Sequence, residues 1–368
     1  MKLLFVTTAP VAFDVGTPER EPLGGTESCV CYLARALAER GHQVTLLANL
    51  AADCPPELLG IRHMKIETLY DKAFCARECF DAFICLSDPT TGAWLKKLDP
   101  KAFNVAWIHL LPDQPALHSL PTAQQSLDCA VFVSETQRAS IPTSAPTHVI
   151  GNGIAPAFEN MFSSAAELLA AKQDRAVYTT TPFRGLAVLI NVMERMETEI
   201  DLDVYSSMRT YQLGDEEYAE IFVRADRHPR IHRHGAVSQK ALAHNLRQAA
   251  FLAYPCVFEE TYCITALEAM AAGLKVVSTD LGALPETTLG YADLLPIHCA
   301  GLSPEESMQG YIALFEKNIA GFRSEPQAWA ERQFDQLQAV NRACVWRVRA
   351  LEWENFLVPA VAWKQGGA

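Results

Sequence analysis

The feature that most constrains this chain is an alternation of short, continuous apolar runs with helical or loop segments. In the first 150 residues these runs are Leu3–Val6, Val44–Ala48, Phe83–Leu86, Val105–Ile108 and Ala130–Val133. Uninterrupted apolar runs of this length are typical of strands buried on both faces of a parallel sheet. The first two runs are separated by a Gly/Pro-rich loop and a helical pattern over Ser28–Arg40, which favours an α/β domain.

The same alternation starts again after a polar, Ala-rich stretch between Ile154 and Asp174. Its apolar runs are Ala176–Tyr178, Leu202–Tyr205, Phe251–Tyr254 and Val276–Ser278, and its expected helices are Leu186–Met196, Lys240–Ala249, Thr261–Ala272 and a long region over Pro326–Phe356. A length of 368 residues suits two domains. We therefore predict Rossmann-like domains over residues 1–165 and 166–335, followed by a closing helix over 336–368. Ligands of such sheets bind at the carboxyl ends of the strands.

Charge and hydropathy restrict the partners of the protein. A formal net charge of −12 argues against a general nucleic-acid binder. The longest apolar stretch, Ala249–Phe258, contains Pro255 and is about half the length of a membrane span. The apolar run at the N-terminus is too short for a signal peptide. We expect a soluble, cytoplasmic protein without a membrane span, and peripheral membrane association remains open.

Two carboxylates in the second half could form a binding site. Glu260 and Glu268 are separated by seven residues, so on one helix they would lie near the same face. Glu260 would then lie at the positive N-terminal end of that helix, beside free backbone N–H groups. This arrangement offers a ligand amide donors and carboxylate acceptors for hydroxyl groups. The alternative is that both side chains are solvated residues on a helix surface.

The segment around these carboxylates resembles the donor-site motif of retaining GT-B glycosyltransferases of family 4, the glycosyl transferases group 1. The family pattern is Pro-Ser, a Glu, a helix ending in Glu-Ala-Met-Ala-x-Gly-x-Pro-Val-Val, and a Gly-x-x-x-Glu turn. The matching residues here are Glu260, Glu268–Gly273, Val276–Val277 and Gly282–Glu286. Two positions depart from the pattern, because Lys275 stands where Pro is usual and Cys256 replaces the usual Ser.

Other segments extend this resemblance over most of the chain. Gly24 and Gly25 resemble the Gly-Gly loop of the family, where a backbone without Cβ atoms can approach a phosphate or sugar at a helix start. Taken alone, the two glycines would be an ordinary loop. Val133–Glu135 and Asn152–Ile154 match a strand end and the interdomain turn. The resemblance implies the GT-B fold, with two Rossmann-like domains facing across a cleft and a C-terminal helix crossing back to the N-terminal domain.

The cations that would face a diphosphate only partly follow the family pattern. The family has an Arg and a Lys-Gly pair after the first strand of its C-terminal domain. Here Arg184 precedes Gly185 and matches the Lys, whereas the Arg position falls among Thr179–Thr181 and is lost. A guanidinium can clamp a phosphate through bidentate, charge-assisted bonds. Arg209 is a candidate for the second cation, with a solvated arginine as the alternative, and the Thr hydroxyls could also donate to phosphate.

His109 ends an apolar run and precedes a Pro-containing loop. Many members of the family have a His here, near the anomeric carbon and the acceptor, which implies a site role for His109. The alternative is a structural His with satisfied hydrogen bonds.

Two further patterns resemble metal sites, and we predict that neither of them binds a metal ion. Asp201-Leu202-Asp203 has the form of the D-x-D motif of metal-dependent GT-A transferases, but here it leads into a strand. His228, His232 and His234 cluster without a nearby Cys. We expect no cofactor and no metal.

The resemblance implies a retaining, metal-independent glycosyltransferase of the hexosyltransferase type, which moves a sugar from a UDP- or GDP-linked donor to a hydroxyl acceptor on a glycan, a lipid-linked sugar or a small molecule. Glu268 would bind the ribose hydroxyls and Glu260 the donor sugar. The diphosphate would be stabilised by Arg184 and by the helix start, at Thr261, Tyr262, Cys263 and Ile264. His109, Glu260 and Arg184 would form the catalytic set. The alternatives are another GT-B activity, such as a sugar-nucleotide epimerase or phosphorylase, and a degenerate domain that acts only as an interaction module.

Overall fold

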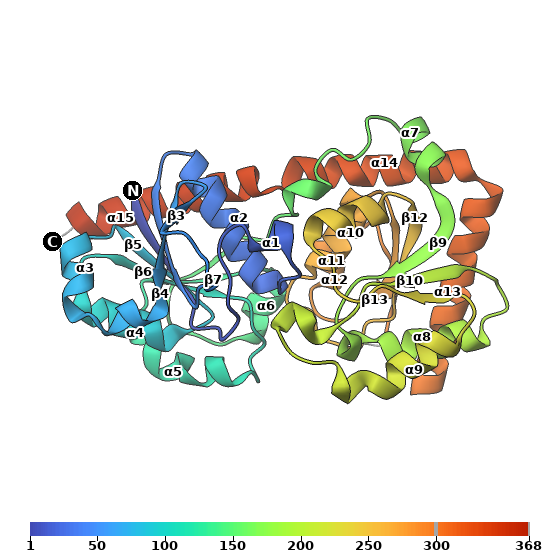
Figure 1. Ribbon diagram of the computed structural model, residues 1–368, viewed down its shortest axis with the longest axis horizontal. Coiled ribbons are helices and arrows are strands. Elements are labelled where there is room, and N and C mark those ends of the chain that lie inside the picture. The colour runs from blue at the N-terminus through green and yellow to red at the C-terminus, as the bar shows by residue number, and fades with distance from the viewer. Residues whose placement is uncertain (298–300, 367–368) are drawn as a thin grey trace. The chain divides into compact units, whose positions relative to one another are not determined.

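The computed structural model describes residues 1–297 and 301–366, and these residues form two compact units (Figure 1). The first unit contains Met1–Pro18, Gly24–Gly153 and Trp346–Ala368. The second unit contains Glu19–Leu23 and Ile154–Val345. Each unit is built around its own sheet, so the two are described separately.

The first unit contains an eight-stranded sheet in the order β3-β4-β2-β1-β5-β6-β7-β8, parallel except for the β3–β4 pair. Its strands are β1 (Lys2–Val6), β2 (Gln43–Ala48), β3 (Glu57–Leu58), β4 (Ile61–Lys65), β5 (Ala82–Leu86), β6 (Phe103–Ile108), β7 (Cys129–Phe132) and β8 (Thr147–Val149). The five apolar runs predicted as strands are β1, β2, β5, β6 and β7. From β1 the chain proceeds to β2 on one side and later to β5 on the other. The order therefore reverses between β1 and β5, where sheets of this kind bind ligands.

The helices of the first unit are α2 (Gly25–Glu39), α3 (Lys72–Glu78), α4 (Pro89–Leu98), α5 (Leu120–Ala123), α6 (Glu135–Ser140) and α15 (Trp346–Gly366). The short helix α1 (Thr17–Arg20) has two residues in each unit. The last helix, α15, packs on α2 and β6 (Figure 1). On α15, Trp353 stacks edge-on against Trp107 with ring centroids 5.3 Å apart, and Glu354 accepts a hydrogen bond from Arg40 Nε at 2.7 Å. The prediction of a C-terminal helix that returns to the N-terminal domain is therefore confirmed.

The second unit contains a six-stranded, fully parallel sheet in the order β11-β10-β9-β12-β13-β14. Its strands are β9 (Gln173–Tyr178), β10 (Asp201–Val204), β11 (Ile231–Arg233), β12 (Ala249–Tyr254), β13 (Lys275–Thr279) and β14 (Asp293–Leu295). Its helices are α7 (Ala165–Ala171), α8 (Leu186–Arg195), α9 (Ala219–Arg227), α10 (Gln239–Leu246), α11 (Ile264–Ala271), α12 (Leu284–Thr287), α13 (Pro304–Ser324) and α14 (Pro326–Ala343). The chain proceeds outward from β9 to β11 and then restarts at β12 on the other side of β9. The strand order thus reverses between β9 and β12.

Several helix boundaries differ from the prediction. Helix α2 begins three residues before the predicted Ser28, and α10 ends at Leu246 and not at Ala249. Helix α11 begins at Ile264 and not at Thr261, because Cys263 has a left-handed backbone with φ of 62° and an α-helix cannot pass through it. The predicted closing helical region consists of two helices, α14 and α15, because the chain leaves helical geometry at Cys344 and Val345. Val345 instead forms an isolated parallel bridge with Ile154.

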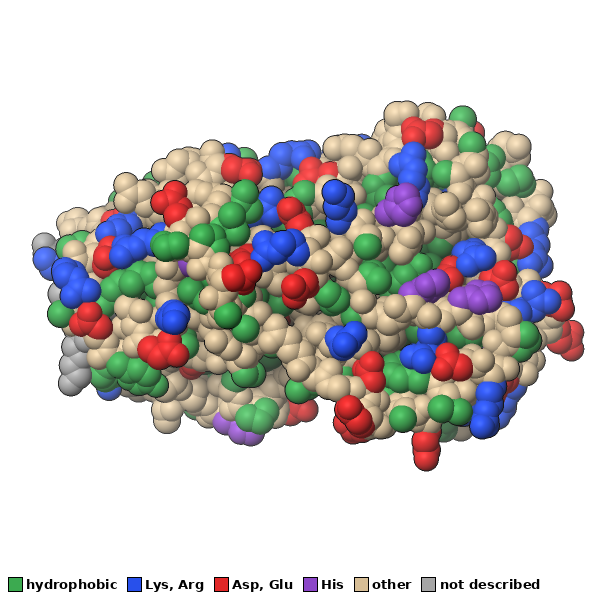
Figure 2. Space-filling view, in the orientation of Figure 1, with side chains coloured by type: hydrophobic (Ala, Val, Ile, Leu, Met, Phe, Trp, Pro, Cys, Tyr) green, Lys and Arg blue, Asp and Glu red, His purple; other side chains and the backbone are tan. Residues whose placement is uncertain are grey.

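The surface carries charges of both signs. Figure 2 shows Lys and Arg side chains interspersed with Asp and Glu over the visible face, with neither sign gathered into one patch. Among the described residues, no helix combines the length and apolar character needed to cross a membrane.

Candidate active site at the carboxyl ends of the second sheet

An ion pair lies where the strand order of the second sheet reverses. Arg184 ends the short 3₁₀ helix η5 (Pro182–Arg184) that follows β9, and Glu260 lies in the loop that follows β12. Arg184 Nη1 donates a hydrogen bond to Glu260 Oε1 at 2.6 Å. The Tyr254 hydroxyl donates to the same oxygen, also at 2.6 Å. The fold therefore brings two of the predicted site residues into direct contact.

The surroundings of Arg184 maintain its positive charge. Its guanidinium lies over the Phe258 ring at 4.1 Å and near the Phe183 ring at 5.5 Å, which adds cation–π attraction. Burial opposes the charge, but the Glu260 carboxylate together with Tyr254 and Tyr211 outweighs it, and the pKa of Arg184 is raised well above its ordinary value. The side chain is still 20% exposed, so an anionic ligand can reach it.

Two glycines allow the backbone to pack closely behind this ion pair. Gly185 has φ of 134°, and a Cβ atom there would lie 2.3 Å from the carbonyl oxygen of Pro255. Gly282 has φ of 59°, and a Cβ atom there would lie 2.3 Å from the carbonyl oxygen of Glu260. The same carbonyl accepts a hydrogen bond from the Ala283 N–H at 2.7 Å. Only glycine fits both conformations, so these positions fix where the loops carrying Arg184 and Glu260 run.

Glu268 is the second carboxylate, and it lies on α11, buried in the second unit. Its Oε1 accepts a long hydrogen bond of 3.4 Å from the Ala155 N–H, and its carboxyl group also hydrogen-bonds the Gln239 side chain. Burial raises the pKa of Glu268 to about 8, so the carboxyl holds its proton at neutral pH. The expectation that Glu260 and Glu268 share one helix face is wrong, because Glu260 precedes the first helical residue.

The predicted helix-start residues take several positions. Thr261 and Tyr262 belong to the loop, and the Tyr262 carbonyl accepts a hydrogen bond from the Thr287 hydroxyl. Cys263 is the N-cap of α11 and provides no side-chain cap, and Ile264 is the first helical residue. The backbone N–H groups of this first turn are thus not capped by the Cys263 side chain.

Arg209, the proposed second cation, lies on the 3₁₀ helix η6 (Met208–Tyr211) that follows β10. Its side chain is exposed and forms no ion pair with the residues that the structure describes. Tyr211, on the same short helix, lies near enough to the Arg184 guanidinium to affect its pKa. Arg209 is therefore carried by a segment that reaches the neighbourhood of Arg184.

Sequence reasoning missed several polar groups at these strand ends. Tyr254 is the last residue of the apolar β12 run, and Gln239 is the first residue of α10. The side-chain oxygens Gln239 Oε1, Thr181 Oγ1 and Ser206 Oγ are buried and have no hydrogen-bonding partner within residues 1–297 and 301–366. The sequence does predict the hydroxyls of Thr179–Thr181 as hydrogen-bond donors. It does not indicate Tyr254, Gln239 or Ser206, because a single polar residue at the end of a strand or the start of a helix forms no spacing pattern.

The remaining predicted site residues lie in the first unit. Gly24 is the N-cap of α2 and Gly25 its first residue, and Glu27 in the first turn is buried, which raises its pKa. His109 follows β6, and its backbone N–H donates a hydrogen bond to Ser87 Oγ at 3.1 Å. Its ring lies edge-on to Trp107 at 4.5 Å, and burial lowers its pKa to about 3, so the imidazole is neutral. The site roles of Gly24, Gly25 and His109 stay predictions.

The acidic residues that resemble a D-x-D motif form ion pairs with nearby side chains. Asp203 is buried in β10 and pairs with Arg175 Nη1 and His234 Nε2, each at 2.7 Å. Asp201 starts β10 and lies 3.7 Å from Arg175 Nη2. Within the described part of the chain, no three His, Cys, Asp or Glu side chains are arranged to hold a metal ion.

Comparison with known proteins identifies part of the second unit. Residues 177–309, which begin at the end of β9, continue through β14 and include the Arg184–Glu260 pair, match the family described as glycosyl transferases group 1. These residues form a glycosyl transferases group 1 domain. The resemblance drawn from the Glu260–Glu286 motif is therefore confirmed. No curated protein matches the chain significantly.

Solved structures resemble the whole chain, including the part outside the group 1 domain. Sucrose-phosphate synthase from Thermosynechococcus elongatus is 16% identical with a TM-score of 0.73, and the match covers 98% of this chain and 100% of that one. HepE from Anabaena in complex with UDP-glucose is 15% identical with a TM-score of 0.72, at 98% and 100% coverage. WaaG, a glycosyltransferase of lipopolysaccharide biosynthesis, is 13% identical with a TM-score of 0.65, at 97% and 99% coverage. These likenesses confirm the GT-B fold.

Proposed function

We propose that the protein is a retaining, metal-independent glycosyltransferase that transfers a hexose from a nucleoside diphosphate sugar to a hydroxyl acceptor. The observation that carries this proposal is the Arg184–Glu260 ion pair at the strand-order reversal of a group 1 domain. The structure of HepE with UDP-glucose supports a nucleotide-linked sugar as donor.

Arg184 and Glu260 suit the two halves of such a donor. The Arg184 guanidinium would bind the diphosphate, on which negative charge grows as the bond to the sugar breaks. The hydrogen bonds that the Glu260 carboxylate accepts from Arg184 and Tyr254 both end on Oε1, so Oε2 can accept a hydrogen bond from a sugar hydroxyl. Tyr254 acts as a positioning residue, because its hydroxyl fixes the Glu260 carboxylate.

The proposed reaction balances without a side-chain base. The bond between the anomeric carbon and the diphosphate oxygen breaks, and its electron pair goes to that oxygen. The acceptor hydroxyl oxygen bonds to the anomeric carbon on the same face, and its proton passes to an oxygen of the leaving diphosphate. His109 would contribute as a neutral hydrogen-bonding group and not as a general acid, because its imidazole is not protonated to imidazolium at neutral pH.

Release of nucleoside diphosphate tests this function. The protein would be incubated with UDP-glucose, UDP-N-acetylglucosamine or GDP-mannose, alone and with candidate hydroxyl acceptors, in buffer containing EDTA. We expect one donor to give slow release to water, faster release with a matching acceptor, and an α-linked product from an α-linked donor. Activity lost in EDTA and restored by Mn²⁺ would contradict the metal-independent mechanism. If no sugar nucleotide binds or is cleaved, the proposal is wrong.

A further inference from the structure

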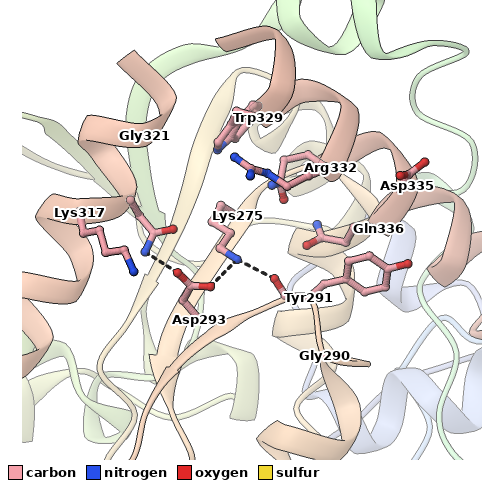
Figure 3. Close-up of a pocket in the computed structure, with 12 residues that line it drawn as sticks. Lys275, Gly290, Tyr291, Asp293, Lys317, Gly321, Trp329, Arg332, Asp335 and Gln336 are labelled. Atoms are coloured by element: carbon pink, nitrogen blue, oxygen red, sulfur yellow. Dashed lines mark hydrogen bonds and ion pairs between the residues drawn. The ribbon is translucent and has the colours of Figure 1, made fainter. Parts of the chain in front are cut away.

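A pocket in the second unit lies away from the candidate active site (Figure 3). It has a volume of about 530 Å³ and lies beside the β13–β14 edge of the sheet, against α13 and α14. Lys275, in its wall, is the first residue of β13, whereas the candidate active site lies at the carboxyl ends of the strands. A five-residue strand spans roughly 13 Å at about 3.3 Å per residue, so the two sites are separate.

Basic side chains from three elements face this pocket. Lys275 Nζ donates to the Tyr291 carbonyl at 2.7 Å and pairs with Asp293 at 2.7 Å, so its charge is compensated. Lys317 on α13 and Arg332 on α14 are exposed and have no ion-pair partner among the described residues. Figure 3 shows Arg332 projecting from α14 toward Lys275, beside the indole nitrogen of Trp329. The lining therefore carries three cations against two carboxylates, Asp293 and Asp335, and its two exposed cations, Lys317 and Arg332, take part in no ion pair within the described residues.

The floor of the pocket contains buried polar atoms without partners. Trp329, Gln333 and Gln336 all lie on α14, and each is at most 4% exposed. Trp329 Nε1, Gln333 Oε1 and Gln336 Oε1 have no hydrogen-bonding partner in the described parts of the chain. The Gln336 amide group donates to the carbonyls of Met270 and Leu274 at 3.2 and 2.8 Å, which fixes the direction of its oxygen. A buried polar atom without a partner costs about 1–3 kcal/mol, so a ligand that satisfies these atoms gains affinity.

We propose that this pocket binds a small sugar that carries an anionic group, either a phosphate or a carboxylate. The anionic group contacts Arg332, Lys317 and the Trp329 N–H, and the sugar hydroxyls donate to the Gln333 and Gln336 oxygens. Inorganic phosphate as a dianion fits less well, because its oxygens chiefly accept hydrogen bonds while the two glutamine oxygens require donors. A neutral sugar has no anionic group to pair with Lys317 and Arg332. The volume lies within the range of about 300–1,000 Å³ of small-molecule sites.

This inference does not depend on the proposed transferase activity, and calorimetric titration of the full chain tests it. The probes are glucose 6-phosphate, glucuronate, glucose and inorganic phosphate at constant ionic strength. We expect one or both anionic sugars to bind at least tenfold more tightly than glucose or phosphate. Arg332→Ala and Gln333→Leu should each weaken that binding about tenfold or more. The matched controls are Arg227→Ala, an exposed arginine on α9, and Gln338→Leu, an exposed glutamine on α14, and neither should change the affinity.

The other outcomes contradict the proposal in distinguishable ways. Equal affinity for phosphate indicates a simple anion site, and equal affinity for glucose indicates a neutral sugar site. Loss of binding in Arg184→Ala, with Arg332→Ala unaffected, places the probe in the candidate active site. No binding of any probe at about 10 mM indicates that solvent alone fills the pocket. Circular dichroism and thermal unfolding of each variant separate lost binding from lost folding.

Discussion

At the residue scale, Arg184 is the group on which the proposed chemistry depends most. Its guanidinium is preorganised by Glu260 at 2.6 Å and by the Phe258 ring. We expect Arg184→Ala to lower kcat about 10²–10³-fold at saturating donor, the usual cost of losing one preorganised donor to a developing charge. Arg184→Lys should restore part of the rate, because it returns the charge without the bidentate geometry.

Steady-state nucleoside diphosphate release measures this effect. Arg227→Ala, which removes an exposed arginine on α9, is the matched control and should retain the wild-type rate. Near-normal turnover of Arg184→Ala would mean that another group stabilises the diphosphate, with Arg209 the first residue to test.

We predict that Glu268 makes donor binding depend on pH. Burial raises the pKa of Glu268 from 4.5 to about 8, so between these pH values the free protein holds a proton that a solvated Glu side chain would release. If ribose hydroxyls donate to the Glu268 carboxylate, binding must remove this proton. We therefore expect the affinity for UDP-glucose to rise between about pH 5 and pH 8 and then to level off. The loss of one proton on binding allows the affinity to increase by at most about tenfold for each pH unit.

Calorimetry in buffers of different ionisation enthalpy measures this proton directly. Wild-type protein at pH 7 should release close to one proton on binding, and Glu268→Gln should release none and show an affinity that does not vary over this range. Wild-type binding without proton release would remove Glu268 from contact with the ribose.

At the element scale, the Gly282 turn holds the Glu260 loop in place. A Cβ atom at Gly282 would collide with the Glu260 carbonyl, whereas one at Gly235, which also has a left-handed φ, would meet no atom within 4 Å. We expect Gly235→Ala to cost only the backbone strain, roughly 1–2 kcal/mol. Gly282→Ala should destabilise the protein more and also weaken donor binding, because Glu260 must move. Urea unfolding and UDP-glucose titration measure the two effects, and equal losses in both variants would contradict this role of the turn.

The same scale shows what the sequence can and cannot specify. Apolar runs such as Phe251–Tyr254 predicted central strands, because burial on both faces leaves a local pattern. The start of α11 was mispredicted, because Cys263 has a left-handed backbone that no residue pattern marks. The ion pair was not foreseen either, since Arg184 and Glu260 are 76 residues apart and meet only through the strand order. The family motif located both residues but not their contact.

At the scale of the whole molecule, α15 completes the first unit although it comes last in the chain. Trp353 is fully buried against Trp107, whereas Trp363 on the same helix is 77% exposed. We expect Trp353→Ala to reduce the free energy of unfolding of the first unit by about 3–5 kcal/mol, the usual cost of truncating a buried aromatic side chain. Trp363→Ala is the matched control and should cost less than about 0.5 kcal/mol.

Hydrogen exchange monitored by mass spectrometry should show the loss of protection in α2 and β6 of the first unit, while β12 and β13 of the second unit keep theirs. If Trp353→Ala weakens β12 and β13 as much as β6, the two units unfold together and the helix stabilises both of them.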